Sequence, residues 1–337
     1  MGFSLSTLAL CATQLLGCAG NTSPPAKNGE HDALPPLETD DLAALLPIAG
    51  LRWIVLTRPR AIAETAWLIP SIGRLAPEKG LSAFARAKGL DLRQIPEAVI
   101  ASYESDEDGE ARLYLVRHNA QASLIEKLFR ARITRDDERV ADRSDVVRRM
   151  GTMGTRSEAL TLLGSDVAAF QEGGSMDRGP ARIAALYGLG RLKTARTALV
   201  GAPLEALDKR LGDAPAKALA PGPFEGELAR GLRGLLEGAT AVGAAATPTA
   251  RETIALTIAA MGDFARGGEA AAKTLLSAWN DAASAPLGRL LALDEPASPL
   301  QTEVDEESII LRVELDAEAL FEGLAAATSA DVTEFLR

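Results

Sequence analysis

The sequence predicts an α+β fold in which antiparallel sheets are covered by helices. Apolar and polar residues alternate in short runs such as Ala98 to Tyr103 and Ala111 to His118, which is typical of half-buried strands. Amphipathic helical stretches such as Ser123 to Arg132 lie between these runs. Consecutive strands across short charged turns favour antiparallel pairing, and the helices between them favour a covering layer.

In the part of the chain up to residue 211, prolines and glycines separate the predicted segments. The predicted helices are Asp40 to Leu46, Ala61 to Ile69, Glu78 to Ala87, Ser123 to Arg132, Pro180 to Leu192 and Pro203 to Leu211. The predicted strands are Leu51 to Leu56, Ala98 to Tyr103, Ala111 to His118, Val146 to Met153, Ala159 to Leu163 and Val167 to Phe170. The dense mixed charges of Arg135 to Arg149 predict a solvated hairpin.

The remaining chain continues the same mixture. Ala220 to Phe224 predicts a rigid loop, and Leu228 to Leu236 fits either a helix or a strand. Small residues in the next two predicted strands indicate close packing of a sheet against helices. The predicted elements are the strands Ala239 to Ala246, Ile254 to Met261 and Ser308 to Leu315, and the helices Glu269 to Ala283 and Ala317 to Ala326.

Two parts of the chain resemble each other in pattern. The run Gly109 to Val116, with a helix after it, echoes the run Glu307 to Glu314 and its helix. Likewise Glu158 to Leu163 echoes Thr253 to Ile258. We therefore expect a diverged duplication of one α+β unit, with residues 40–200 and 201–337 as the two halves and one antiparallel sheet in each.

Composition limits the function. The 337 residues are 47% hydrophobic, enough for one large domain or two ordinary ones. A formal net charge of −10 disfavours nucleic-acid binding, because phosphate contacts need a cationic face. Both cysteines, Cys11 and Cys18, lie near the start of the chain, so the rest of it offers no disulfide, thiol nucleophile or thiolate metal site.

A short apolar segment near the amino terminus leads to Leu15-Leu16-Gly17-Cys18. This stretch resembles the lipobox of bacterial lipoprotein precursors, in which a Leu stands three residues before an obligatory Cys. The resemblance implies a signal peptide at residues 1–17, cleavage before Cys18 and a diacylglycerol on the Cys18 thiol. The apolar segment is long enough for a signal peptide and too short to span a bilayer. No Lys or Arg precedes it, unlike the usual pattern.

Residues 18–39 predict a lipidated cysteine followed by a flexible tether. The stretch Asn21 to Asp40 is rich in Pro, Ser and Gly, a composition that does not pack. Two acyl chains would anchor it stably. Ala19 after the cysteine resembles the default for the outer membrane. The resemblance thus implies a lipid-anchored protein of the cell envelope, facing the periplasm or the cell surface.

Two stretches partly match ligand-binding motifs, but local structure explains each of them better. Glu104 to Gly109 matches the opening of a calcium loop, but Leu115 stands where the loop needs a bidentate Glu, so the stretch predicts a hairpin tip. Gly188 to Thr194 lacks the glycines of a phosphate loop and predicts a helix C-terminus. His31 and His118 are too few for a zinc site or a catalytic triad.

Acidic residues are plentiful, and a sequence does not show how far apart their side chains lie in the folded protein. Glu303 and Asp305 to Glu307 form a cluster at a strand entry that predicts a solvated surface. Glu225 and Glu227, beside the Pro221 to Phe224 loop, are the candidates for a functional acidic patch. The sequence does not decide whether two of these carboxylates form a catalytic pair like that of glycosidases.

These observations favour a membrane-anchored envelope lipoprotein that acts as a binding or accessory module rather than as an enzyme, without cofactor or metal. Its expected partners are the membrane, through lipid on Cys18, and an envelope protein, but no nucleic acid. Two alternatives stay open. A deep cleft with a close carboxylate pair would indicate a glycan hydrolase, and an apolar cavity would indicate a lipid or lipoprotein carrier.

Overall fold

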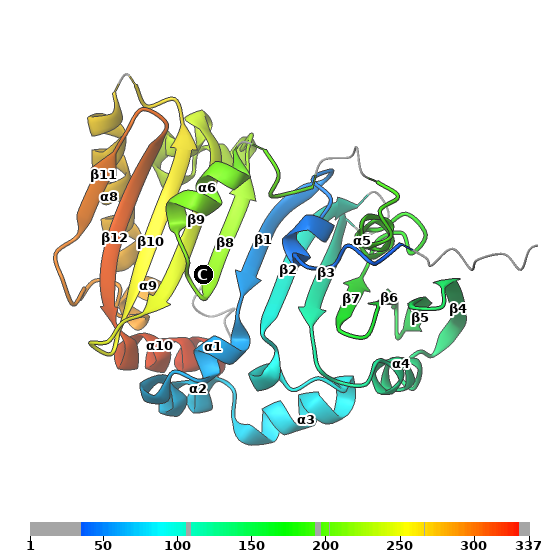
Figure 1. Ribbon diagram of the computed structural model, residues 1–337. Coiled ribbons are helices and arrows are strands. Elements are labelled where there is room, and N and C mark those ends of the chain that lie inside the picture. Colours follow the sequence, from blue (N-terminus) through cyan, green and yellow to red (C-terminus); the bar gives the residue numbers. More distant parts are fainter. Residues whose placement is uncertain (1–34, 106–108, 193–196, 202, 266, 330–337) are drawn as a thin grey trace, which may run out of the picture. The chain divides into compact units, whose positions relative to one another are not determined.

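The computed structural model describes residues 35–105, 109–192, 197–201, 203–265 and 267–329. From Leu37 onward the chain forms one compact unit around a twelve-stranded antiparallel sheet. The strand order is β11-β12-β10-β9-β8-β1-β2-β3-β7-β6-β5-β4 (Figure 1). The α+β class and the antiparallel pairing are confirmed, and the two expected sheets are joined into one.

The strands follow the alternating runs of the sequence. Their bounds are β1 Leu51–Thr57, β2 Glu97–Ser105, β3 Gly109–Arg117, β4 Arg135–Arg143, β5 Val146–Met153, β6 Arg156–Leu163, β7 Val167–Glu172, β8 Ala216–Pro221, β9 Ala239–Pro248, β10 Thr253–Gly262, β11 Gln301–Val304 and β12 Ser308–Asp316. The sequence patterns had indicated all of them except β8 and β11, and had described β4 only as part of a hairpin.

The α-helices connect the strands and cover the sheet. They are α1 Pro59–Ala63, α2 Ile69–Leu75, α3 Glu78–Lys88, α4 Ala122–Arg130, α5 Pro180–Gly188, α6 Leu204–Leu211, α7 Gly226–Ala229, α8 Gly268–Ser284, α9 Pro286–Leu290 and α10 Ala317–Ser329. Short 3₁₀ helices are η1 Leu42–Leu45, η2 Ala66–Leu68, η3 Leu92–Gln94 and η4 Gly231–Gly238. The predicted helix Ala61 to Ile69 is divided, because Thr65 has an extended backbone that interrupts it.

Strand β8 is the element that makes one sheet out of two. It pairs with β1, with Ile54 opposite Leu219 and Thr57 opposite Ala216, and on its other side with β9. Its sequence, Ala-Lys-Ala-Leu-Ala-Pro, has few residues that favour strands, so its propensity alone did not reveal it. Pairing on both sides supplies the backbone hydrogen bonds that hold it extended. The expected Ala220 to Phe224 loop therefore starts inside a strand.

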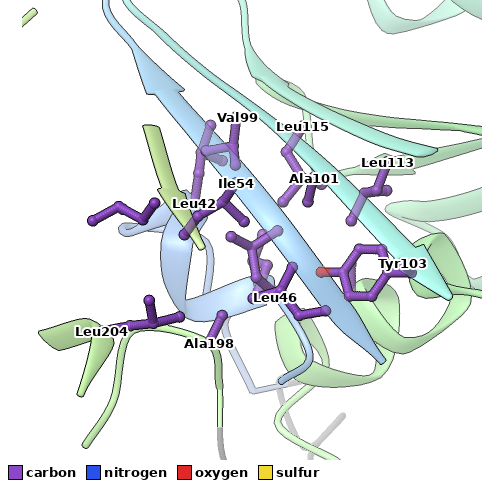
Figure 2. Packing of buried hydrophobic residues seen from close by; sticks show 14 of the residues in the cluster. Leu42, Leu46, Ile54, Val99, Ala101, Tyr103, Leu113, Leu115, Ala198 and Leu204 are labelled. Carbon is purple, nitrogen blue, oxygen red and sulfur yellow. The ribbon is translucent and has the colours of Figure 1, made fainter. Parts of the chain in front are cut away.

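One side of the sheet, here called the front face, carries the main core. It is covered by η1, α5 and α6, which lie in front of the strands in Figure 1. Figure 2 shows the centre of this core, where Ile54 and Ala101 of the sheet pack against Leu42 and Leu46. Asp41 starts η1, since its carboxylate accepts a hydrogen bond from the Ala43 N–H at 2.8 Å.

The other side, the back face, has three separate clusters of buried residues. In the first half, Ile125 and Phe129 of α4 pack on Leu160 and Ala168 of the sheet. In the second half, Trp279 of α8 and neighbouring residues pack on β12.

In the third cluster, Leu68 of η2 and Ala317 of α10 pack with Ile254 of β10. Between the clusters, Val55 of β1 is half-buried and Ala218 of β8 is exposed.

Candidate functional site

A cavity of about 360 Å³ lies on the back face of the first half, above β1, β2, β3 and β7 and beside α1 and α3. Its lining is apolar except for Thr57, Lys88, Tyr114 and Glu172. The volume falls near the lower end of the range of small-molecule sites, about 300–1,000 Å³. An apolar lining with a few polar groups is also typical of such sites.

The helix α3 forms one wall of this cavity. Glu78 begins it after Pro77, and Gly89 ends it with φ of +75°, a left-handed conformation that glycine adopts without strain. A side chain at Gly89 would also approach Leu128 of α4, since its Cβ would lie 3.2 Å from the Leu128 Cδ1. This turn brings Phe84 and Lys88 over the sheet, where they line the cavity with Ile95.

Two charged side chains, Lys88 and Glu172, line the cavity, and the charges of Arg132 and Glu158 lie near enough to Lys88 to shift its pKa. These four residues are here called the charge cluster. Glu158 and Glu172 stand opposite each other on β6 and β7. Tyr114 donates a long hydrogen bond of 3.4 Å to the Glu172 Oε2. Within the described part of the chain, no ion pair shorter than 4 Å joins members of the cluster.

Burial perturbs these groups. It lowers the pKa of Lys88, and the nearby Arg132 lowers it further against the attraction of Glu158 and Glu172. Burial also lowers the pKa of Arg132 and raises the pKa of Glu158. Perturbed groups at the end of a cavity are a feature of binding and catalytic sites.

Arg132 has an unusual environment. Its guanidinium lies 5.5 Å from the centre of the Phe129 ring, a cation–π distance. Its Nε is buried and has no hydrogen-bond acceptor among the described residues. A buried donor without an acceptor is costly, so the position is suited to an acceptor that a ligand brings.

A second cavity, of about 430 Å³, lies beside the start of α5. Its lining is more polar and includes Glu104, Asp177 and Arg178. The first free N–H of α5, that of Ala181, already donates to the Gln171 Oε1 at 3.1 Å. This helix start is therefore satisfied within the protein, and the cavity is a weaker candidate than the apolar one.

The residues that the sequence singled out do not gather at the apolar cavity. Cys18 and His31 lie outside the described residues. Glu104 lies near the end of β2 and Gly109 begins β3, as the hairpin prediction required. Residues 106–108, between them, lie outside the described part of the chain. Glu225 is exposed in its loop, and the side chain of Glu227 is not among those described.

The remaining sequence candidates lie away from the apolar cavity, at the end of α5 and after β3. Gly188 is the last residue of α5, which confirms the predicted helix end, whereas Lys193 and Thr194 lie outside the described part. His118 is buried after β3, and burial lowers its pKa. Among the described residues, no group of three or more His, Cys, Asp or Glu is placed to hold a metal ion.

The site residues escaped sequence reasoning for identifiable reasons. Lys88 stands at the end of a helix, where a cation is expected for its interaction with the helix dipole. Glu172 is the last residue of β7 and Glu158 the third of β6, positions near strand ends where charged residues are usually solvated. The available signal was the alternation in β6 and β7, which places both glutamates on the same side as Leu160 and Phe170.

No family model, curated protein or solved structure matches this chain. Its function therefore has to be inferred from its own residues. Of the helices in the described ranges, none combines the length and the apolar character needed to cross a bilayer.

Proposed function

We propose that this protein is a lipid-anchored module of the cell envelope that binds an apolar or amphipathic small molecule in the cavity beside α3. The observation that carries the binding role is the 360 Å³ apolar cavity bordered by the charge cluster. The lipid anchor on Cys18 and the envelope location rest on the lipobox resemblance. The role combines the binding module and the carrier that the sequence left open, and it needs no catalytic step.

Filling the cavity tests the binding role. Ala98 is a floor residue with 8% exposure, and Ala98→Phe places a ring in the space above it. We expect the full-length protein purified from bacterial envelopes to carry a small molecule that mass spectrometry of an organic extract detects. The Ala98→Phe variant should lose it. Ala83→Phe adds the same ring on an exposed position of α3 and should retain it.

Unchanged binding in a folded Ala98→Phe variant, with a thermal unfolding midpoint close to that of the parent, would reject the cavity as the site. The anchor has a separate test. Intact mass of membrane-fraction protein should show a chain that begins at Cys18 and carries acyl groups, lost in Cys18→Ser. An unprocessed chain in the cytosol would reject the anchor.

A hydrolase is the second candidate, favoured by the Glu158 and Glu172 pair. Directly opposed side chains in an antiparallel pair have Cβ atoms about 4.5–5.5 Å apart, compatible with the close carboxylates of retaining glycosidases. The raised pKa of Glu158 would suit an acid. Release of sugar fragments from purified cell-wall glycan, abolished in both Glu158→Gln and Glu172→Gln, would favour this candidate over binding alone.

We also propose that the sheet arose by duplication of one unit. The order β1-β2-β3-β7 on one side of the β1–β8 junction is mirrored by β8-β9-β10-β12 on the other. In both halves a helix follows the third strand and packs on the back face, α4 after β3 and α8 after β10. A front-face helix precedes the first strand of each half, η1 before β1 and α6 before β8.

This correspondence differs from the one that the sequence suggested. The sequence pattern matched β3 to β12. By position in the strand order, β3 instead corresponds to β10, and β7 corresponds to β12. An experimental structure tests the duplication directly. Superposition of the four strands of each half with α4 on α8 would support it, and strands that match in order but not in helix position would reject it.

A further inference from the structure

A row of apolar side chains leads from the cavity across the middle of the back face. Ile100 of β2 stands opposite Val55 of β1, which stands opposite Ala218 of β8. Ala218 stands opposite Ala244 of β9, and Ala244 opposite Ile258 of β10. These five residues are here called the central row. Ile100 also lines the cavity, so the row begins inside it.

The central row is partly exposed to solvent, although its strands are internal. Val55, Ile100, Ala244 and Ile258 are half-buried, and Ala218 is exposed. The next residues along the same strands point to the front face and are buried: Ile54, Leu219, Ala245 and Ala259 are at most 3% exposed. The front side of β8 is packed by α6. On the back face the row therefore lies between the two covered halves, and Ile258 at its far end packs against the second-half core.

The row has the length of a lipid tail. It crosses five adjacent strands, and four spacings of about 4.8 Å give about 19 Å. One leaflet of a bilayer contributes about 15 Å to the hydrocarbon core, which is the span of ordinary acyl chains. The narrow floor formed by Ala218 and Ala244 suits a single chain that lies across the strands.

The end of the row at the charge cluster suits an anionic group. Lys88 and Glu172 line the cavity, and Arg132 lies close enough to Lys88 to affect its pKa. The Arg132 Nε is a buried donor with no acceptor in the described part of the chain. A carboxylate or phosphate oxygen from a ligand would satisfy this donor, and the raised pKa of Glu158 lessens the repulsion between that carboxyl group and an anionic ligand.

We propose that the cavity and the central row together bind a single-chain amphipath with an anionic head, a long-chain carboxylate, whose head contacts Lys88 and Arg132 and whose tail lies along the row. This inference rests on the proposed binding function and specifies its ligand class. The head is held by charge-assisted hydrogen bonds, and the tail covers apolar surface that is otherwise exposed to water.

Titration of the delipidated full-length protein with hexadecanoate, octanoate and hexadecanoate methyl ester tests each part. We expect hexadecanoate to bind at least about a hundredfold more tightly than octanoate, because the longer tail covers more of the row. The methyl ester and the Lys88→Met variant should each weaken binding about tenfold or more, since both remove a charge-assisted contact. Lys88→Met should weaken hexadecanoate binding more than methyl ester binding, because the ester carries no charge.

Ala218→Asp places a carboxylate in the middle of the row at an exposed position, where water can hydrate it. It should weaken hexadecanoate binding and spare octanoate, whose tail ends before it. Ala250→Asp adds the same charge at an exposed position in the β9–β10 turn and should change neither. Equal affinities for the carboxylate and its methyl ester would overturn the anionic head.

Equal affinities for the two chain lengths would overturn the role of the row. A dimer of the delipidated protein that Ala218→Asp converts to a monomer would overturn it as well, because a second copy would then cover the row. If none of the carboxylates binds and yet an extracted uncharged molecule is lost in Ala98→Phe, this inference fails and the proposed binding function stands. If Ala98→Phe changes nothing either, both fail.

Discussion

The two outer ends of the sheet are held in different ways. At the β4 end, charged side chains enter the covering layers, and Arg148 and Arg149 are each only 8% exposed. At the β11 end, apolar side chains do this work, and Leu311 and Val313 are at most 2% exposed. The same task, covering the last strands of a long sheet, is achieved by ionic networks in one half and by a hydrophobic core in the other.

The β4 end has a network on each face. On the front face, the Asp142 Oδ2 accepts hydrogen bonds from the Arg148 Nε at 3.0 Å and the Arg182 Nη1 at 2.8 Å, which ties β4 and β5 to α5. On the back face, the Glu126 Oε1 of α4 accepts from Arg139 at 2.7 Å and Arg149 at 3.0 Å. The edge strand is therefore attached to a helix on both sides.

The β11 end depends on one long helix. Trp279 and Leu275 of α8 are 7% and 3% exposed and pack with alternate residues of β12. The edge strand β11 itself is exposed along its four residues. Both edges resist pairing with other chains, β4 through dense charges and β11 through its shortness.

The largest effect that separates the two ends is expected at Trp279. Trp279→Ala removes a large buried side chain and should lower the free energy of unfolding by about 4 kcal/mol. Leu124→Ala on α4, at a position 43% exposed, is the control and should cost far less. Urea unfolding followed by circular dichroism measures both. Equal losses would show that α8 is not the main support of the second half.

The next effect is expected at Asp142. Asp142→Ala leaves the guanidinium groups of Arg148 and Arg182 without their shared carboxylate, and should cost about 3 kcal/mol because the charges stay largely buried. Asp145→Ala removes a more exposed carboxylate, 42% accessible, and should cost less than about 1 kcal/mol. Replacing Asp142, Arg148 and Arg182 together by Leu, Met and Met should recover most of the loss. No recovery would mean that the network itself stabilises the edge.

Acid should weaken the β4 end first. A hydrogen bond from Arg149 lowers the pKa of Asp137. Burial raises the pKa of Glu126, but hydrogen bonds from Arg139 and Arg149 outweigh this effect, so the pKa of Glu126 is also lowered. Carboxyls with lowered folded-state pKa values stabilise the fold above their unfolded pKa of about 4, and this contribution is lost as pH falls through the folded value. Hydrogen exchange of β5 amides should therefore accelerate between pH 5 and about pH 3 more than that of β10 amides, after correction for intrinsic rates. Glu126→Gln with Asp137→Asn should remove the difference.

The same contrast explains what the sequence could predict. Most strands and helices were predictable because their apolar residues recur with a clear period, as in β12 and α8. The hairpin expected at Arg135 to Arg149 is confirmed and its first five residues are exposed as expected, but Arg148 and Arg149 are buried. Whether Arg148 and Arg149 are solvated depends on partners contributed by α4 and α5, which are distant in sequence.

The site was harder to predict than the fold for a related reason. Lys88, Arg132, Glu158 and Glu172 come from four separate segments of the chain, and each alone has the character of an ordinary surface charge. The central row is likewise created by β8, whose alanines carry little strand signal but join the two halves. Pairing across the sheet, rather than any local pattern, assembles both features.

The smallest effect is expected at the second-half edge, at Arg312. Its Nη1 lies 2.6 Å from the Glu303 Oε2 across β11 and β12, but the two side chains are 44% and 54% exposed. Water and salt screen such a pair, so Arg312→Gln should lower the free energy of unfolding by no more than about 0.5 kcal/mol. Arg149→Gln, at a side chain that is 10% exposed in the first-half network, should cost several times more in the same urea titration. If Arg312→Gln cost as much as Arg149→Gln, the second half would also depend on ion pairs at its edge, and the division of the sheet into an ionic and an apolar end would not hold.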